Sequence, residues 1–378
     1  MKNSFKNLFA MVVGCLIAVV LLEVFLRIYN PFHFRVRGQQ IELRANHEEF
    51  RINEWTPKLD SLIVHVKNNL GFRGPNMPDD FDNYLSIITI GGSTTECRYS
   101  TEGKDWPAHL AQDLQTNFKN VWLDNAGLDG HSTFGHQVLL NDYVVKIRPK
   151  VVLFYVGIND MGTKDLNSFD KGALKGNNNG AMNFLVNHSE LANVVFNILR
   201  MWRAKKHKLE HNLETDLLKE PQMTMTTEAE NAFLQTYKPY AQKYKARLQQ
   251  LANTCKANGI YPVFMTQPVL YGEGTDDVTG ADLENIKVWK EANGKAVWAL
   301  LKTYNETTKM VAAENQCGLL DIAEKLPKSS RYYYDLMHYS NEGSEKVAWL
   351  AWQELVPILM EKFPAYILQE NENEGSKL

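Results

Sequence analysis

Residues 84–96 read YLSIITIGGSTTE, an apolar run that leads straight into two glycines and a serine. Its β-branched first half is typical of a strand that is buried on both faces. Gly91 and Gly92 permit a sharp turn after such a strand, and Ser93 is therefore expected at the strand's tip, where a helix begins. A hydroxyl in this place can serve as a nucleophile, although Ser93 or Thr94 could equally cap the helix that follows.

Short apolar runs and helical segments continue to alternate downstream. Further strands are predicted at 121–124, 151–156, 260–266 and 318–322, and helices at 106–118 and 132–147. Strands that alternate with helices predict a parallel sheet covered by helices on both faces. Ligand sites in such sheets lie at the carboxyl ends of the strands.

Three further polar clusters could contribute to a site at that edge: DNAGLDG at 124–130, GIND at 157–160 and DLMH at 335–338. Gly130 can present its backbone amide to an oxyanion, and the neutral Asn159 carboxamide can donate to one as well. Asp335 lies three residues before His338, a spacing that lets a carboxylate orient an imidazole base. Taken singly, each cluster is also compatible with an ordinary turn.

In this order the clusters resemble the SGNH hydrolase superfamily, also called the GDSL esterases and lipases. The motifs are GGST, NAGLDG, GIND and DLMH, and the resemblance extends from about residue 84 to residue 352, with the middle insertion outside it. It implies an α/β fold: a flavodoxin-like three-layer α/β/α domain with a five-stranded parallel sheet.

The resemblance also implies a role for each motif residue. Ser93 would be the nucleophile, His338 the general base and Asp335 the residue that orients the base. The oxyanion hole would combine the backbone amides of Ser93 and Gly130 with the Asn159 side chain. Neither a cofactor nor a metal ion is implied.

Two positions depart from the family pattern: Gly92 stands where the family usually has Asp, and Thr94 where it has Leu. The missing Asp is not a catalytic group, so the subfamily rather than the activity is in doubt. Cys97 is a competing nucleophile, expected one helical turn further on and packed. His131 or His136 is an alternative base, although neither has an obvious acid partner.

The N-terminal region differs from the rest of the chain. Leu8–Ile28 is apolar apart from two charged residues near its end, and about 20 apolar residues suffice to span a bilayer. Residues 1–28 are therefore predicted to be a single-pass transmembrane anchor. Because Lys2 and Lys6 precede the run, the N-terminus is expected in the cytoplasm and the catalytic domain outside it, in the periplasm or the extracellular space. Lipoprotein processing at Cys15 remains an alternative to an uncleaved anchor.

The remainder divides into a connector at 29–80, a catalytic domain at 81–366 with an insertion at about 163–228, and a flexible acidic tail at 367–378. Within the insertion, apolar residues from Leu191 to Trp202 recur at helical spacing, Ser189 could cap the helix, and basic residues crowd its end. This helix either covers the active-site side of the domain or lies on a membrane surface.

Composition excludes several classes of protein. The 378 residues carry a net charge of −3, so no basic field recruits nucleic acid, and neither a P-loop nor a dinucleotide-binding fingerprint is present. The spacing of the four cysteines does not suggest zinc, and a bridge between Cys255 and Cys317 is left open.

The function predicted from the sequence is hydrolysis of a carboxylic ester through an acyl-enzyme, with deacetylation of an envelope glycan as one candidate. The partners would be an acylated glycan or lipid as substrate and the membrane through the N-terminal helix. O-acyl transfer to a polysaccharide could use the same triad, and a lipase or phospholipase is a further alternative. A protein that only binds glycans is least favoured, because all the motif residues are present. The sequence decides neither acyl length nor oligomeric state.

Overall fold

The structure of the chain is a computed structural model, which describes residues 2–32, 34–38, 40–163, 180–206, 211 and 215–369. The chain folds as two compact units. One unit comprises residues 1–44 and 172–210, and the other comprises residues 45–171 and 211–378. Part of the expected insertion, and residues 370–378 of the expected tail, lie outside the described residues.

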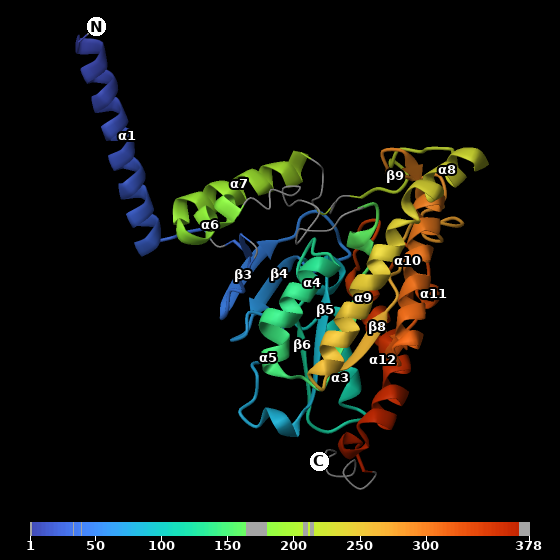
Figure 1. The fold of residues 1–378 in the computed structure, drawn as a ribbon. Coiled ribbons are helices and arrows are strands. Elements are labelled where there is room, and N and C mark those ends of the chain that lie inside the picture. Colours follow the sequence, from blue (N-terminus) through green and yellow to red (C-terminus); the bar gives the residue numbers. More distant parts are fainter. Residues whose placement is uncertain are drawn as a thin grey trace. The chain divides into compact units, whose positions relative to one another are not determined.

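The larger unit is built on a five-stranded sheet with the strand order β11-β8-β7-β5-β6. Figure 1 labels β6, β5 and β8 of this sheet. All four neighbouring pairs are parallel. The strands are β5 (Leu85–Gly91), β6 (Val121–Asn125), β7 (Val151–Tyr155), β8 (Tyr261–Met265) and β11 (Gly318–Leu320). This is the order of a flavodoxin-like sheet, and the predicted fold class is confirmed.

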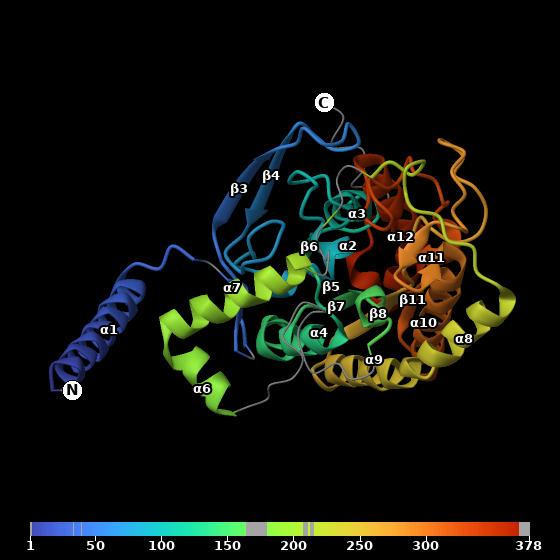
Figure 2. The same cartoon turned by 90° about the horizontal axis from the view of Figure 1, so that it is seen from above.

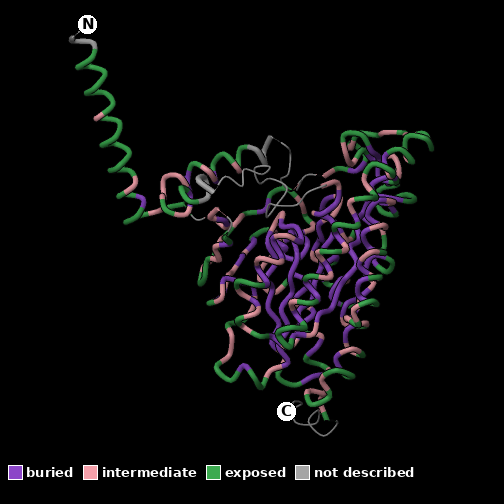
Figure 3. Tube along the Cα trace, viewed as in Figure 1, coloured by how far each residue is buried: buried purple, intermediate pink, exposed green. Residues whose placement is uncertain are grey.

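Helices cover the sheet on both faces (Figure 2). On one face α3 (Trp106–Leu114) packs against α12 (Asn341–Lys362). On the other face α9 (Tyr240–Ala257) packs against both α4 (Thr133–Leu139) and α10 (Gly294–Glu314). Every residue of β5 and β7 is buried, as expected for central strands between two helical layers, and the buried residues concentrate there (Figure 3).

Side-chain caps explain where three of these helices begin. Asp105 accepts a hydrogen bond from the Ala108 amide at the start of α3. Asn293 and Ser340 accept in the same way at the starts of α10 and α12. An oxygen-bearing side chain before the first turn satisfies an amide that the helix itself leaves unpaired.

The larger unit contains further helices and strands. They are β3 (His47–Ile52), β4 (Leu62–Lys67), α2 (Ser93–Glu96), α5 (Val145–Ile147), α8 (Thr227–Tyr237), β9 (Lys287–Trp289), β10 (Ala292–Asn293) and α11 (Ile322–Lys325). The helix expected at 132–147 contains a π-helical turn at Leu140–Val144 between α4 and α5. The stretch expected as a connector contains the antiparallel hairpin β3–β4.

The smaller unit contains α1 (Lys2–Ile28), the two-residue strands β1 (Val36–Arg37) and β2 (Gln40–Ile41), α6 (Gly180–His188) and α7 (Glu190–Lys206). Within α1, Phe5–Ile28 is long and apolar enough to cross a membrane. No residue of its most apolar 18-residue stretch is buried. The hydroxyl of Ser189 accepts a hydrogen bond from the Ala192 amide at 3.1 Å, so the expected cap of α7 is confirmed.

A buried arginine holds together the segments around the carboxyl ends of β5 and β6. The Arg73 side chain is 1% exposed. Its guanidinium donates to the backbone oxygens of Glu96, Cys97 and Ser100 at 2.8, 2.7 and 3.1 Å. It also forms an ion pair with the buried Asp105 at 3.1 Å. These bonds fix the chain that follows Ser93.

Replacement of this arginine should destabilise the larger unit strongly. In Arg73→Met the side-chain volume is retained, but the Asp105 carboxylate is left buried without its cation, which typically costs about 3–5 kcal/mol. Arg98→Met is the matched control, because Arg98 pairs with Glu49 at 3.7 Å on the surface, where a pair contributes about 0–1 kcal/mol. Urea unfolding followed by fluorescence measures both variants. Equal losses in the two variants would contradict the structural role of Arg73.

Candidate active site

The structure brings the first and last sequence motifs together across 245 residues. Ser93 begins α2 directly after β5, and His338 lies in the loop that precedes α12. The His338 Nε2 atom lies 2.8 Å from Ser93 Oγ, and its Nδ1 atom lies 2.6 Å from Asp335 Oδ2. A hydroxyl, an imidazole and a carboxylate in this order can activate the hydroxyl for attack on a carbonyl.

The Asp335 carboxylate is fixed by its own loop. Its Oδ1 atom accepts from the backbone amides of Met337 and His338, both at 2.8 Å. Burial opposes ionisation, but the His338 imidazole and these amides hold the pKa of Asp335 below its ordinary value. The residue is therefore an anion, and His338 Nδ1 donates to it.

Asn159 and the loop that contains Gly130 lie near the turn at Gly92 and Ser93. The Asn159 Nδ2 atom donates to the backbone oxygen of His131 at 3.0 Å, which joins the end of β7 to the loop that contains Gly130. Gly130 has φ +76°, a conformation that favours glycine. A Cβ atom on Gly92 would stand 2.5 Å from Asn159 Nδ2, so the glycine at the position of the family's Asp leaves room for this carboxamide.

Two carboxylates hold the loop between β6 and α4 in place. Glu96 accepts from the backbone amide of Asp129 at 2.5 Å. Asp160 accepts from the Thr133 amide at 3.2 Å and from the Arg247 guanidinium at 3.0 Å. Glu96 of the GGSTTE segment and Asp160 of the GIND segment thus hold the two sides of the loop that contains Gly130.

The competing residues lie in other surroundings. The Cys97 thiol is buried and directed at the backbone oxygen of Thr94, and burial raises its pKa. His136 is buried as well, and burial lowers its pKa to about 3. His131 contributes its backbone oxygen to Asn159, whereas the imidazole that contacts Ser93 belongs to His338.

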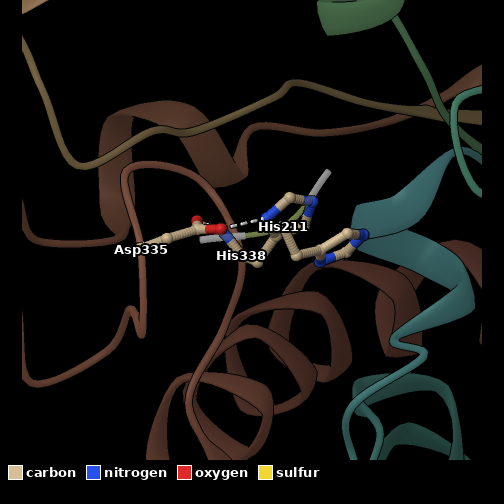
Figure 4. Close-up of side chains that lie close together, drawn as sticks. All are labelled: His211, Asp335 and His338. Carbon is tan, nitrogen blue, oxygen red and sulfur yellow. Dashed lines mark hydrogen bonds and ion pairs between the residues drawn. The ribbon is translucent and has the colours of Figure 1, made fainter. Parts of the chain in front are cut away.

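His211 completes the cluster and was not anticipated from the sequence. Its ring stacks on that of His338, with centroids 3.9 Å apart and planes 21° apart (Figure 4). Its Nδ1 atom lies 2.7 Å from the Tyr334 hydroxyl, and its Nε2 atom lies 3.3 Å from Asp129 Oδ2. Burial lowers the pKa of His211, but Asp129 outweighs it and the net shift is upward. A single histidine in a polar insertion offers no sequence signal for this contact.

Among the described residues, one group of side chains could also hold a metal ion. One ligand atom each from His211, Asp335 and His338 lies within 4.8 Å of the others. A metal ion bound by all three would take the His338 Nδ1 or Nε2 lone pair away from the bonds to Asp335 and Ser93. Metal ligation and the serine–histidine–aspartate arrangement are therefore alternative uses of this cluster.

Comparison with known families identifies the chain. The model of the GDSL-like lipase/acylhydrolase family matches residues 89–346, more than half of the sequence. The chain belongs to this family. It is accordingly an ester-hydrolysing enzyme, and the resemblance inferred from the four motifs is confirmed.

Solved structures give more distant matches. The acetyl xylan esterase AlAXEase is 16% identical with a TM-score of 0.40, over 71% of this chain and 98% of its own. The acetylxylan esterase Axe2 from Geobacillus stearothermophilus is 15% identical with a TM-score of 0.39, over 71% and 93%. TesA is 12% identical with a TM-score of 0.40, over 72% and 99%. A comparison with curated proteins found no match.

The contact between Gly92 and Asn159 generates a prediction for this GDSL enzyme. In Gly92→Ala the new methyl group should displace the flexible Asn159 carboxamide without disturbing the fold. If Asn159 is the oxyanion donor that the family resemblance implies, both Gly92→Ala and Asn159→Ala should lower kcat by roughly 10²–10³ with little change in KM. The double variant should be no worse than either single variant, because both remove one interaction. Losses that multiply in the double variant would contradict the shared cause.

Proposed function

We propose that this GDSL enzyme is a serine esterase in which Ser93 is the nucleophile, His338 the general base and Asp335 the orienting carboxylate. The observation that carries the proposal is a pair of hydrogen bonds at His338: Nε2 accepts from Ser93 Oγ at 2.8 Å, and Nδ1 donates to Asp335 Oδ2 at 2.6 Å. The Ser93 and Gly130 amides and the Asn159 side chain are proposed as the oxyanion hole.

The reaction proceeds in two halves. Ser93 Oγ attacks the ester carbonyl carbon while its proton passes to His338 Nε2, and the oxyanion donors stabilise the negative oxygen that forms. The alcohol leaves with that proton, and the acyl group remains on Ser93. Water then attacks the acyl-enzyme and gives a proton to His338, and the acid departs as Ser93 Oγ regains the proton.

A short acyl group on a sugar is the proposed substrate. Among the residues that the structure describes, polar or aromatic side chains contact His338 or lie near the turn of Ser93: Asn159, His211, Tyr334 and Asp335. A long alkyl chain gains little affinity from polar walls, whereas polar and aromatic groups suit hydroxyl-rich rings. An acetylated envelope glycan meets both conditions.

The enzyme is proposed to be membrane-anchored, with α1 as an uncleaved span and the larger unit extracytoplasmic. The last turns of α1 support retention of the helix, because Glu23 accepts from the Ser189 hydroxyl at 2.8 Å and from the Leu191 amide at 3.0 Å. A segment removed as a signal peptide would take these bonds with it. The orientation rests on Lys2 and Lys6.

Replacing either Ser93 or His338 of the proposed triad should abolish activity, and replacing both should have no larger effect. Ser93→Ala and His338→Ala are each expected to lower kcat by roughly 10⁴–10⁶, and the double variant should lose no more, because both residues act in the same step. Release of p-nitrophenol from p-nitrophenyl acetate and labelling by a fluorophosphonate measure the two effects. The exposed Ser61→Ala serves as the serine control. Near-normal turnover or labelling in Ser93→Ala would refute the assignment.

Acyl length gives a separate prediction. For the full chain in nanodiscs, kcat/KM should be highest for the acetate and fall through butyrate, octanoate and decanoate. An apolar pocket would instead add up to about 1–3 kcal/mol per methylene and reverse the order. Rates measured with Ser93→Ala are subtracted for each ester. A steady rise with chain length would replace the glycan proposal with a lipase, while leaving the triad in place.

A further inference from the structure

Helix α7 buries two asparagines beside Val194 and exposes a row of large apolar side chains. Asn193 and Asn197 are buried, whereas four large apolar side chains are between 48% and 62% exposed: Val195, Ile198, Leu199 and Trp202. These four residues, at positions i, i+3, i+4 and i+7 of the helix, form one face and are called here the outward stripe. In a helix that packs on a protein core the apolar face points inward, so this arrangement is the reverse of the usual one.

Hydrogen bonds fix the rotation of the helix. The Asn197 amide donates to the backbone oxygen of Val36 at 3.0 Å, and to the backbone and side-chain oxygens of Asn193 at 3.0 and 2.9 Å. The first of these bonds ties the polar face of α7 to β1. The outward stripe therefore cannot turn inward without leaving buried amides unpaired.

The start of α7 is joined to the end of α1. The Glu23 carboxylate accepts from the Ser189 hydroxyl and from the Glu190 and Leu191 amides at 2.8, 3.1 and 3.0 Å. The Arg27 guanidinium donates to Glu23 at 2.7 Å and to the backbone oxygen of His188 at 2.5 Å. A carboxylate near the end of an apolar span is thus satisfied by the first turn of the neighbouring helix, whose N-terminus favours an anion.

This junction sets the depth of α7. Glu23 lies five residues before Ile28, the last residue of α1, which corresponds to about 7.5 Å along a helix. Helices that lie in a bilayer interface sit about 5–10 Å into the boundary between headgroups and acyl chains. If α1 spans the bilayer, the first turn of α7 lies at this depth.

The other end of α7 is basic. Its last two turns contain Arg200, Arg203, Lys205 and Lys206 in the sequence, and clusters of basic residues on a helix are typical of segments that bind anionic lipids. Phe184 and Leu185 on the adjoining α6 are exposed as well. The unit thus combines an apolar surface with a cationic end, the pattern of a helix that lies on an anionic bilayer.

We propose that α7 lies in the interface of the bilayer that α1 crosses, with the outward stripe against the acyl chains and the basic end on anionic phospholipid headgroups. The proposal rests on the proposed anchor, and it makes α1 and α7 together a two-helix attachment rather than a single tether. The smaller unit is then held at a defined depth and rotation in the membrane.

Spin labels on the full chain test this arrangement. In a Cys15→Ala, Cys317→Ser background, which leaves the two buried cysteines, a nitroxide is placed at Ile198→Cys in vesicles of phosphatidylcholine with about one quarter phosphatidylglycerol. Collisions with oxygen, which concentrates in acyl chains, are compared with collisions with a water-soluble nickel chelate. The expected result is a higher ratio of oxygen collisions to nickel collisions at residue 198 than at a label on the exposed Gln235 of α8. Vesicles without phosphatidylglycerol should reduce the difference.

A label at Val12→Cys separates the proposal from the anchor on which it rests. Preferential oxygen collisions at residue 12, together with nickel collisions at residue 198 equal to those at Gln235, would overturn the interfacial helix and leave the span intact. Protection of residue 198 from both reagents would also overturn it, because the stripe would then be covered by protein, either a second copy or this chain itself. Nickel collisions at residue 12 would overturn the span.

Discussion

The guanidinium of Arg73 carries its charge in a part of the larger unit from which water is excluded. Such a charge is tolerated only when it is paired and hydrogen-bonded, and here three backbone oxygens and Asp105 meet the requirement. The three oxygens belong to the chain just after Ser93, so the hydrogen bonds that stabilise the buried charge also fix the turn that follows this serine. Asp105 in turn caps the start of α3, which packs against β6 and α12. Geometry at the strand ends therefore depends on a residue outside every motif.

The central strands were predictable because each apolar run is bounded by turn residues. The run at 151–156 became β7, Val151–Tyr155, with an error of one residue. The meeting of the GGST, NAGLDG and GIND motifs was predictable for a related reason, since each follows a strand and the carboxyl ends of parallel strands share one edge of a sheet. The spacing of Asp335 and His338 allowed their contact, and the structure has it at 2.6 Å. The assignment of catalytic roles remains a proposal that rests on this geometry.

What could not be predicted depends on contacts between distant segments. His211 reaches His338 across more than a hundred residues, and nothing in its neighbourhood distinguishes it from a surface histidine. The same holds for Arg73. For α7, periodicity located the apolar stripe but not the side to which it would face, because that side depends on the bond between Asn197 and Val36. Periodicity reports that a helix has two unlike faces, and only the surroundings decide which one is covered.

The bonds between Glu23 and the first turn of α7 bear on how the enzyme can be handled in the laboratory. A shortened protein that begins after Ile28 is the usual route to a membrane-free sample, but it would deprive the first turn of α7 of its carboxylate partner. In the proposed arrangement, the same sample would also expose to water the apolar residues of α7 that otherwise contact lipid. Low solubility or stability of such a sample would therefore say little about the larger unit. Preparations of the whole chain in detergent or nanodiscs are the sounder starting point.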